Sequence, residues 1–234
     1  MTNFILKTKY IYPKEIWIPA QTLSSRVKNK NFRPFFGEYS LMHILVQKLT
    51  DDFPKSSIIL STDQVIFVKK IFKNFKNVLI VKRPGNLLGN SIREKELLSH
   101  FSSVIKKNYN DTVMIAQCTD PFFNNHLKMF KKYLFLNKKR KREISMFASY
   151  PIKKQAFIDN QIINGGMGDW HSITQELKVL DINRWSCFIS LKKTFVNYGY
   201  QIPPNSVPFR DSSVLLDIDN LKDFNEASKY YKKN

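Results

Sequence analysis

Residues 15–35 read EIWIPAQTLSSRVKNKNFRPF, an apolar segment followed by a polar, cationic one. The apolar run 16–18 stops at Pro19, which is typical of a buried strand whose end opens into a loop. The loop carries hydroxyl, amide and cationic side chains: Gln21, Ser24, Ser25, Arg26, Lys28, Asn29, Lys30 and Asn31. Such groups, with free backbone N–H groups, can bind phosphate oxygens. A solvated surface loop is the alternative, because the segment has neither a Walker Lys–Ser/Thr pair nor a Gly-x-Gly-x-x-Gly motif.

Strands and helices alternate over the next hundred residues. Apolar runs predict strands at 56–60, 78–81 and 112–116, and helical spacing predicts helices at 40–51, 65–75, 93–107 and 124–136. This alternation implies a parallel sheet with right-handed crossovers. We therefore predict an α/β fold, three-layered and Rossmann-like, with a mostly parallel sheet.

The pattern changes after residue 142. We expect strands at 144–149, 187–190 and 214–216, a hairpin arm at 157–163, a proline-marked irregular loop at 203–208 and a helix at 221–231. A length of 234 residues with 43% hydrophobic content can bury a full core. Residues 1–234 are therefore interpreted as one domain, with a small arm at about 150–185.

Polar residues follow the predicted strands at the edge where open α/β sheets bind ligands. They are Ser61, Thr62 and Asp63, then Arg83, then Gln117, Thr119 and Asp120. Asp63 also suits the N-cap of the next helix, and we expect that role for it. The residues after the 112–116 strand suit helix capping equally well.

Asp217 and Asp219 flank one apolar residue, Ile218. On an extended backbone both carboxylates point to one face and Ile218 points into the core. Two hard oxygen ligands side by side suit Mg²⁺, with water and phosphate oxygens as its other ligands. Helix capping is the competing role for Asp219.

The opening loop resembles that of the cytidylyltransferases that make CMP-activated sugar acids, the CMP-sialic acid and CMP-Kdo synthetases. The spacing of Pro19, Ala20, Ser24, Arg26, Lys30 and Asn31 carries this resemblance. Later segments resemble further landmarks of the family in the same order: Ser61-Thr62-Asp63, Arg83-Pro84, Gln117-Cys118-Thr119-Asp120-Pro121 and Asp217-Ile218-Asp219. The resemblance covers most of the chain.

The resemblance implies a nucleotide-diphospho-sugar transferase fold and transfer of CMP from CTP to a sugar acid, with release of pyrophosphate. It implies Mg²⁺ on Asp217 and Asp219, and a triphosphate held by Lys30, Arg26 and Ser24. Lys30, Arg26 and Asp219 are the expected catalytic residues. Nucleotide contacts are expected from Ala20, Gln21, Ser24, Asn31, Arg83 and Gln117. The arm is expected to form a homodimer and to reach the sugar acid through Lys153, Lys154 and Gln175.

The chain departs from the family pattern at Gln21 and Phe123, where arginine is usual, and at Asn90 and Thr174. Loss of an arginine at position 21 removes a charge-assisted phosphate contact. Two alternatives therefore stay open: a nucleotidyltransferase with another base or acceptor, and a weak or inactive relative that binds nucleotide or an anionic partner.

The formal charge of +19 is compatible with polyanion binding, but the lysines are mostly dispersed. The dense run 138–142 is interpreted as the polar end of a helix, so no specific nucleic-acid partner is expected. No run is long enough to span a membrane, and the lysine-interrupted N-terminus lacks a signal-peptide pattern. We expect a cytoplasmic protein whose two cysteines, Cys118 and Cys187, are reduced and packed.

Overall fold

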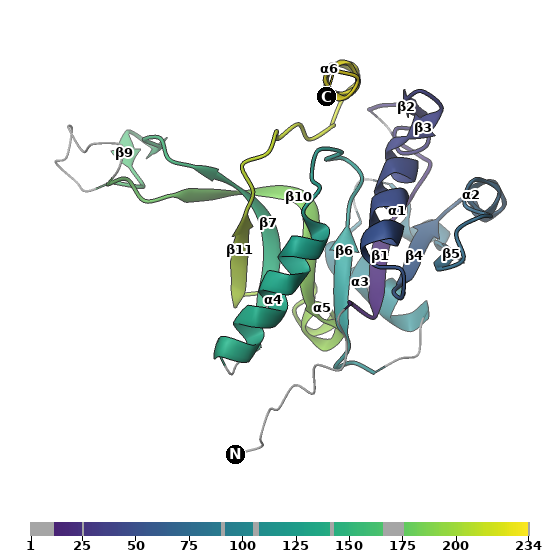
Figure 1. Cartoon of the computed structure of the whole chain (residues 1–234), viewed down its shortest axis with the longest axis horizontal. Coiled ribbons are helices and arrows are strands. Elements are labelled where there is room, and N and C mark those ends of the chain that lie inside the picture. Colours follow the sequence, from purple (N-terminus) through teal and green to yellow (C-terminus); the bar gives the residue numbers. More distant parts are fainter. Residues whose placement is uncertain are drawn as a thin grey trace.

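The computed structural model describes residues 12–24, 26–89, 92–104, 108–140, 143–165 and 176–233. Within these residues a seven-stranded sheet forms the centre of the molecule (Figure 1). In spatial order its strands are β11 (Ser206–Arg210), β7 (Ser145–Ile152), β10 (Leu180–Leu191), β6 (Thr112–Ala116), β1 (Glu15–Pro19), β4 (Ser57–Thr62) and β5 (Val78–Lys82). Only β10 runs antiparallel to its neighbours in this sheet. The predicted α/β fold with a mostly parallel sheet is confirmed.

Helices cover both faces of the sheet (Figure 1). They are α1 (Leu41–Asp52), α2 (Val65–Ile71), α3 (Glu94–Val104), α4 (His126–Arg140), α5 (Lys192–Tyr198) and α6 (Leu221–Tyr231), with a 3₁₀ turn at Gly85–Leu87. Strand β1 shows why there are two cores, because its side chains alternate between the faces. Ile16 and Ile18 pack in the core under α1 and α4, whereas Trp17 packs in the core under α3 and α5. There Trp17 stacks on Phe101 with ring centroids 5.2 Å apart.

Two small hairpins complete the described structure. β2 (Pro34–Phe36) pairs with β3 (Tyr39–Ser40), directly before α1, and lies beside α6. β8 (Phe157–Ile158) pairs with β9 (Gln161–Ile162) at the end of the arm that β7 and β10 extend from the sheet (Figure 1). The predicted hairpin at 157–163 is therefore present.

Four predictions from the sequence are wrong. Residues 214–216 form no strand, and the last strand described is β11, which overlaps the segment expected to be an irregular loop. Pro208 is tolerated there because β11 is an edge strand, paired only with β7, so one side of its backbone needs no partner. Helix α2 ends at Ile71, earlier than expected.

The fourth error concerns Asp63, which does not cap α2. Gln64 occupies the N-cap position and makes no side-chain capping bond. The carboxylate of Asp63 instead accepts hydrogen bonds from the backbone N of Thr22 at 2.7 Å and from its hydroxyl at 2.5 Å. Burial alone would raise the pKa of Asp63, but these bonds lower it. Asp63 therefore anchors the opening loop rather than a helix.

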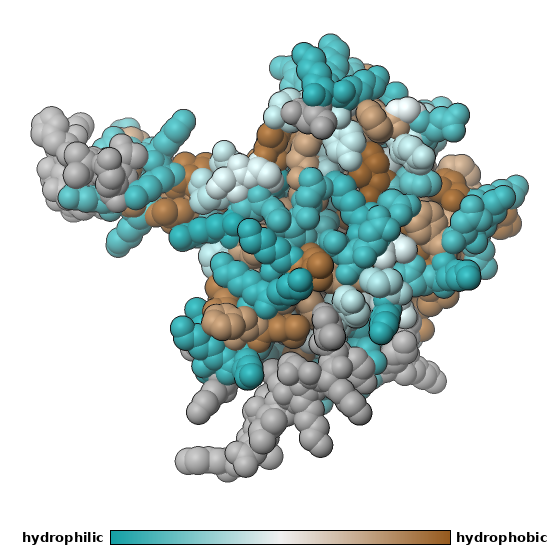
Figure 2. All heavy atoms as spheres, in the orientation of Figure 1, coloured by the Kyte–Doolittle hydropathy of each residue, from teal (hydrophilic) through white to brown (hydrophobic). Residues whose placement is uncertain are grey.

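No helix in the described residues is both long and apolar enough to cross a membrane. Hydrophilic side chains are spread over the face shown in Figure 2 and are interspersed with apolar ones. The last turn of α4 contains Lys138, Lys139 and Arg140, so this part of the basic run ends a helix as expected.

Candidate functional site

A cavity of about 270 Å³ lies at the carboxyl ends of β1 and β6 and beside the start of α3. The residues predicted from the sequence that line it are Gln21, Ser24, Arg26, Lys30, Asn31, Arg83, Gln117 and Thr119. Ala20 is fully buried, and its backbone N donates to the carbonyl of Ser61 at 2.9 Å. The cavity is also lined by Ile92, Arg93 and Glu94, which were not predicted from the sequence as site residues.

The opening loop meets the segment that contains Asp217 and Asp219. The Lys30 ammonium donates to the carbonyl of Ile218 at 2.5 Å. The Arg26 guanidinium forms an ion pair with Asp219 at 3.0 Å, and both side chains are more than half exposed. Ile218 is fully buried, and its N–H donates to the carbonyl of Thr119 at 2.9 Å. Two parts of the chain that are far apart in sequence thus form one cluster of cations and carboxylates.

Asp217 retains the capacity to bind a cation. Its Oδ1 atom is buried and has no hydrogen-bond partner among the described residues. Burial raises the pKa of Asp217; a hydrogen bond from Thr119 and the charge of Lys30 oppose the rise, while the charge of Asp219 adds to it. A divalent cation would relieve both the unpaired oxygen and the repulsion between the two carboxylates.

Asp219 does not cap α6. Asn220 is the N-cap of α6 and forms a capping box with Asp223. Helix capping, the competing role for Asp219, is therefore not its role in this structure. Within the described ranges, no three His, Cys, Asp or Glu side chains form a group that could hold a metal by themselves. A Mg²⁺ ion at Asp217 and Asp219 would therefore take its other ligands from phosphate and water.

Arg83 forms the buried floor of the cavity and is 4% exposed. Its Nη1 donates to Gln21 Oε1 at 3.3 Å, and its Nε donates to Ser61 Oγ at 3.4 Å. Its Nη2 is buried and has no partner in the described part of the chain. Burial lowers the pKa of Arg83 to about 10, against the charge of Asp63. The Nη2 group of Arg83 thus carries N–H donors that no described protein group satisfies.

Asn31 holds the two ends of the loop against the neighbouring strand end. Its Nδ2 donates to the carbonyl of Gln21 at 3.0 Å, and its Oδ1 accepts from the Cys118 thiol at 3.3 Å. Gln117 donates through Nε2 to Gln201 Oε1 at 3.2 Å. These bonds fix the polar wall between β1 and β6.

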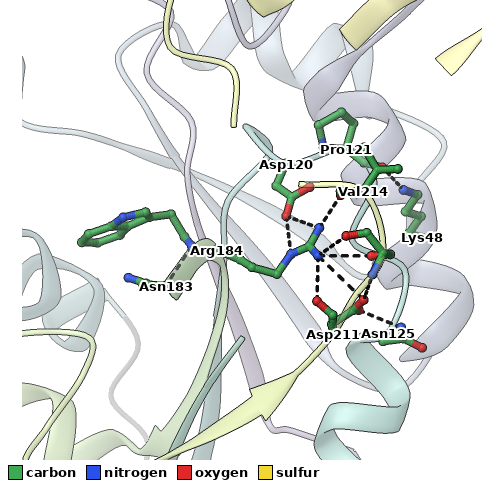
Figure 3. A network of polar contacts seen from close by, with 10 residues as sticks. Lys48, Asp120, Pro121, Asn125, Asn183, Arg184, Asp211 and Val214 are labelled. Carbon is green, nitrogen blue, oxygen red and sulfur yellow. Dashed lines mark hydrogen bonds and ion pairs between the residues drawn. The ribbon is translucent and has the colours of Figure 1, made fainter. Parts of the chain in front are cut away.

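Arg184 organises a buried network that sequence reasoning missed (Figure 3). Its side chain is fully buried and pairs with Asp120 at 2.8 Å and with Asp211 at 3.7 Å. It also donates to the carbonyls of Ser213 at 2.9 Å and Val214 at 2.8 Å. Arg184 thereby ties the loop after β6 to the segment that leads to Asp217. The signal in the sequence was one arginine shortly before the apolar run 187–189.

This network also explains why residues 214–216 are not a strand. The carbonyl of Val214 accepts from the Arg184 side chain rather than from a neighbouring strand, and just beyond these residues the N–H of Ile218 donates to the carbonyl of Thr119. Phe123, which stands where arginine is usual in the resemblance, is buried, with the Arg184 guanidinium 5.6 Å from its ring centroid.

The predicted substrate residues are not brought to the cavity. Lys153 and Lys154 are exposed on the arm and are not among the cavity-lining residues. Gln175, Asn90 and Thr174 lie outside the described residues.

Known proteins share this fold along nearly the whole chain. A 4-diphosphocytidyl-2C-methyl-D-erythritol synthase from Anaerococcus prevotii is 14% identical, with a TM-score of 0.63 over 95% of this chain and 100% of that one. A CMP:2-keto-3-deoxy-manno-octonic acid synthetase solved with CTP is 10% identical, with a TM-score of 0.63 over 94% and 99%. HddC from Yersinia pseudotuberculosis is 13% identical, with a TM-score of 0.57 over 93% and 99%.

At these identities the likeness shows the fold alone. A search of curated proteins gave no match. The sequence model of one family, described as cytidylyltransferase, matches residues 16–163, which is more than half of the chain and includes the opening loop and the strand ends at the cavity. The chain therefore belongs to the cytidylyltransferase family.

Proposed function

We propose that the protein transfers CMP from CTP to a sugar acid and releases pyrophosphate. The observation that carries the proposal is the meeting of Lys30 and Arg26 with the segment 217–219 beside one cavity. A nucleoside triphosphate needs cations and hydrogen-bond donors along its phosphates, and this cluster provides both. A structural neighbour solved with CTP has the same fold.

The residues would divide the work as follows. Lys30, Arg26 and Ser24 hold the triphosphate, while Asn31, Gln21, Gln117 and the free donor of Arg83 face the nucleoside. Asp217 and Asp219 would hold Mg²⁺, which when bound neutralises phosphate charge. The rate enhancement would come mainly from alignment and charge stabilisation.

In the reaction, a hydroxyl oxygen of the sugar acid bonds to the α-phosphorus of CTP. The bond from that phosphorus to the bridging oxygen of the β-phosphate breaks, and both bonding electrons leave with pyrophosphate. The hydroxyl proton passes to water. Arg26 can exchange its exposed partner Asp219 for a phosphate oxygen at little cost, because exposed ion pairs contribute weakly to stability.

The arm is proposed to form a homodimer in the cytoplasm. Apolar side chains are exposed on it at Phe157, Ile158, Ile163 and Ile182. A second copy would cover them. In such a dimer Lys153 and Lys154, with Gln175, would reach the carboxylate of the sugar acid.

The test compares two lysines of the same loop. Lys30→Met should weaken Mg²⁺–CTP binding about tenfold to a hundredfold, because a charge-assisted contact is lost. Lys28 is exposed and does not line the cavity, so Lys28→Met is the matched control and should bind as the wild type does.

Binding is measured by calorimetry with CTP, UTP, ATP and GTP, and turnover by pyrophosphate release. The acceptors are sugar acids of the Kdo and nonulosonate classes and, as the competing acceptor, methylerythritol phosphate. Equal CTP binding by the Lys30 and Lys28 variants would refute the site. Pyrophosphate release only with methylerythritol phosphate would refute the sugar-acid assignment.

A further inference from the structure

His100, on α3, lies behind the cavity floor and reaches it through one intermediate residue. Its Nε2 is 2.9 Å from the hydroxyl oxygen of Ser61, which is fully buried at the end of β4. The same oxygen accepts from Arg83 Nε at 3.4 Å. His100, Ser61 and Arg83 therefore form a relay that ends at the unpartnered Nη2 of Arg83.

The direction of the hydrogen bonds follows from chemistry. The guanidinium of Arg83 can only donate, so the Ser61 oxygen accepts from it. The Ser61 hydroxyl is buried and His100 Nε2 is the one acceptor for its proton among the hydrogen bonds of the described residues, so the proton is directed at His100. The neutral imidazole then accepts at Nε2 and carries its own proton on Nδ1. A protonated imidazole would donate to the same oxygen, leave the Ser61 hydroxyl proton without an acceptor and place a second cation beside Arg83.

We propose that His100 is a positioning residue for nucleotide recognition, which through Ser61 holds Arg83 with its free donor toward the nucleoside. This inference rests on the proposed function. It assigns to His100 a role that requires the neutral imidazole, so nucleoside recognition should weaken in acid. Burial lowers the pKa of His100 and the charge of Arg83 lowers it further, which keeps the imidazole neutral at pH 7.

The charged groups near this relay shift the pKa values of His100 and Arg83. Arg83 is the charged group acting on His100, and Asp63 in turn acts on Arg83. On its own helix, His100 lies against the ring of Phe101, with ring centroids 5.9 Å apart. None of these residues is a proposed metal ligand or one of the residues proposed to hold the triphosphate, Lys30, Arg26 and Ser24, so triphosphate binding should not depend on the relay.

That separation gives the test. Calorimetry with Mg²⁺ compares CTP with inorganic tripolyphosphate, which has no nucleoside, on the wild type, His100→Ala and His100→Gln. His100→Ala should bind CTP about tenfold more weakly and bind tripolyphosphate unchanged. His100→Gln should restore CTP binding, because its amide oxygen can accept from Ser61 but does not titrate.

The same titrations at pH 7.5 and 5.5 complete the test. On acidification, the affinity of the wild type for CTP should fall more than the affinity of His100→Gln. Protonation of CTP affects both proteins equally, so its effect cancels in this comparison. His43→Gln is the matched control, because His43 is also half-buried but lies among Tyr39, Phe72 and Phe75. It should behave as the wild type does.

If His100→Ala binds CTP normally, or loses tripolyphosphate equally, the relay is refuted. These outcomes differ from failure of the proposed function, in which the wild type itself binds no CTP.

Discussion

Replacing Arg184 by methionine should destabilise the fold strongly at neutral pH and much less in acid. Arg184 is the direct ionic partner of Asp120, and both side chains are fully buried. Removing one member of a buried pair leaves an uncompensated charge, which costs about 3–5 kcal/mol. The loss of Arg184 should destabilise the charge of Asp211 less, because the Asn125 side chain and the backbone N of Ser213 each donate to its carboxylate at 2.8 Å.

The pH dependence follows from Asp120. Burial raises its pKa to about 6, although Arg184 opposes the rise. A raised pKa means that the folded state binds the proton more tightly than the unfolded state. Stability from this group is therefore full below the unfolded value of about 4 and is lost as pH rises through about 6. Without Arg184 the pKa rises further, so the variant should lose more stability than the wild type over this range.

Urea unfolding at pH 8 and pH 5 measures the effect. The free energy of unfolding of Arg184→Met should fall by about 3–5 kcal/mol at pH 8 and by clearly less at pH 5. Adding Asp120→Asn should recover most of the loss at pH 8. Arg210→Met is the control, because Arg210 pairs with Asp181 while half exposed, and it should cost less than about 1 kcal/mol. The same loss at both pH values would contradict the reasoning.

Three smaller changes test other parts of the structure. Asn220→Ala removes the N-cap of α6 and should lower the unfolding free energy by about 1 kcal/mol, read from urea unfolding; no change would mean that the capping box with Asp223 is not formed in solution. Thr22→Val removes the hydroxyl that binds Asp63 and should cost about 2 kcal/mol and weaken CTP binding, whereas unchanged values for both would argue against the anchor. Burial raises the pKa of Cys118 to about 12, so iodoacetamide at pH 8 should modify this thiol only after unfolding, as mass spectrometry would show; rapid labelling of the native protein would contradict its burial.

The central elements could be predicted from sequence because their apolar pattern is local. The strand at 112–116 and the helix at 221–231 have the predicted bounds, since each is an apolar run or stripe between polar residues. Much of the cavity wall was also predictable, because polar residues after parallel strands share one edge of the sheet.

The rest depends on partners that are remote in sequence. Pro208 argued against a strand, and only the edge position of β11 makes it acceptable. Asp63 looked like a cap because its bond to Thr22 spans 41 positions. The burial of Arg184 could not be predicted, because its ionic partners Asp120 and Asp211 are remote from it in sequence.

The bond between Lys30 and Ile218 joins positions 188 apart, and it has a consequence for the growing polypeptide. Four strands that are neighbours in the sheet, β6, β1, β4 and β5, can leave the ribosome before Ile218 is translated. A nascent chain can therefore assemble much of its sheet while still lacking the acidic half of the cluster. Ribosome-bound fragments ending before residue 217 should be compact yet unable to complete this site, so the site closes only after the sheet has begun to fold.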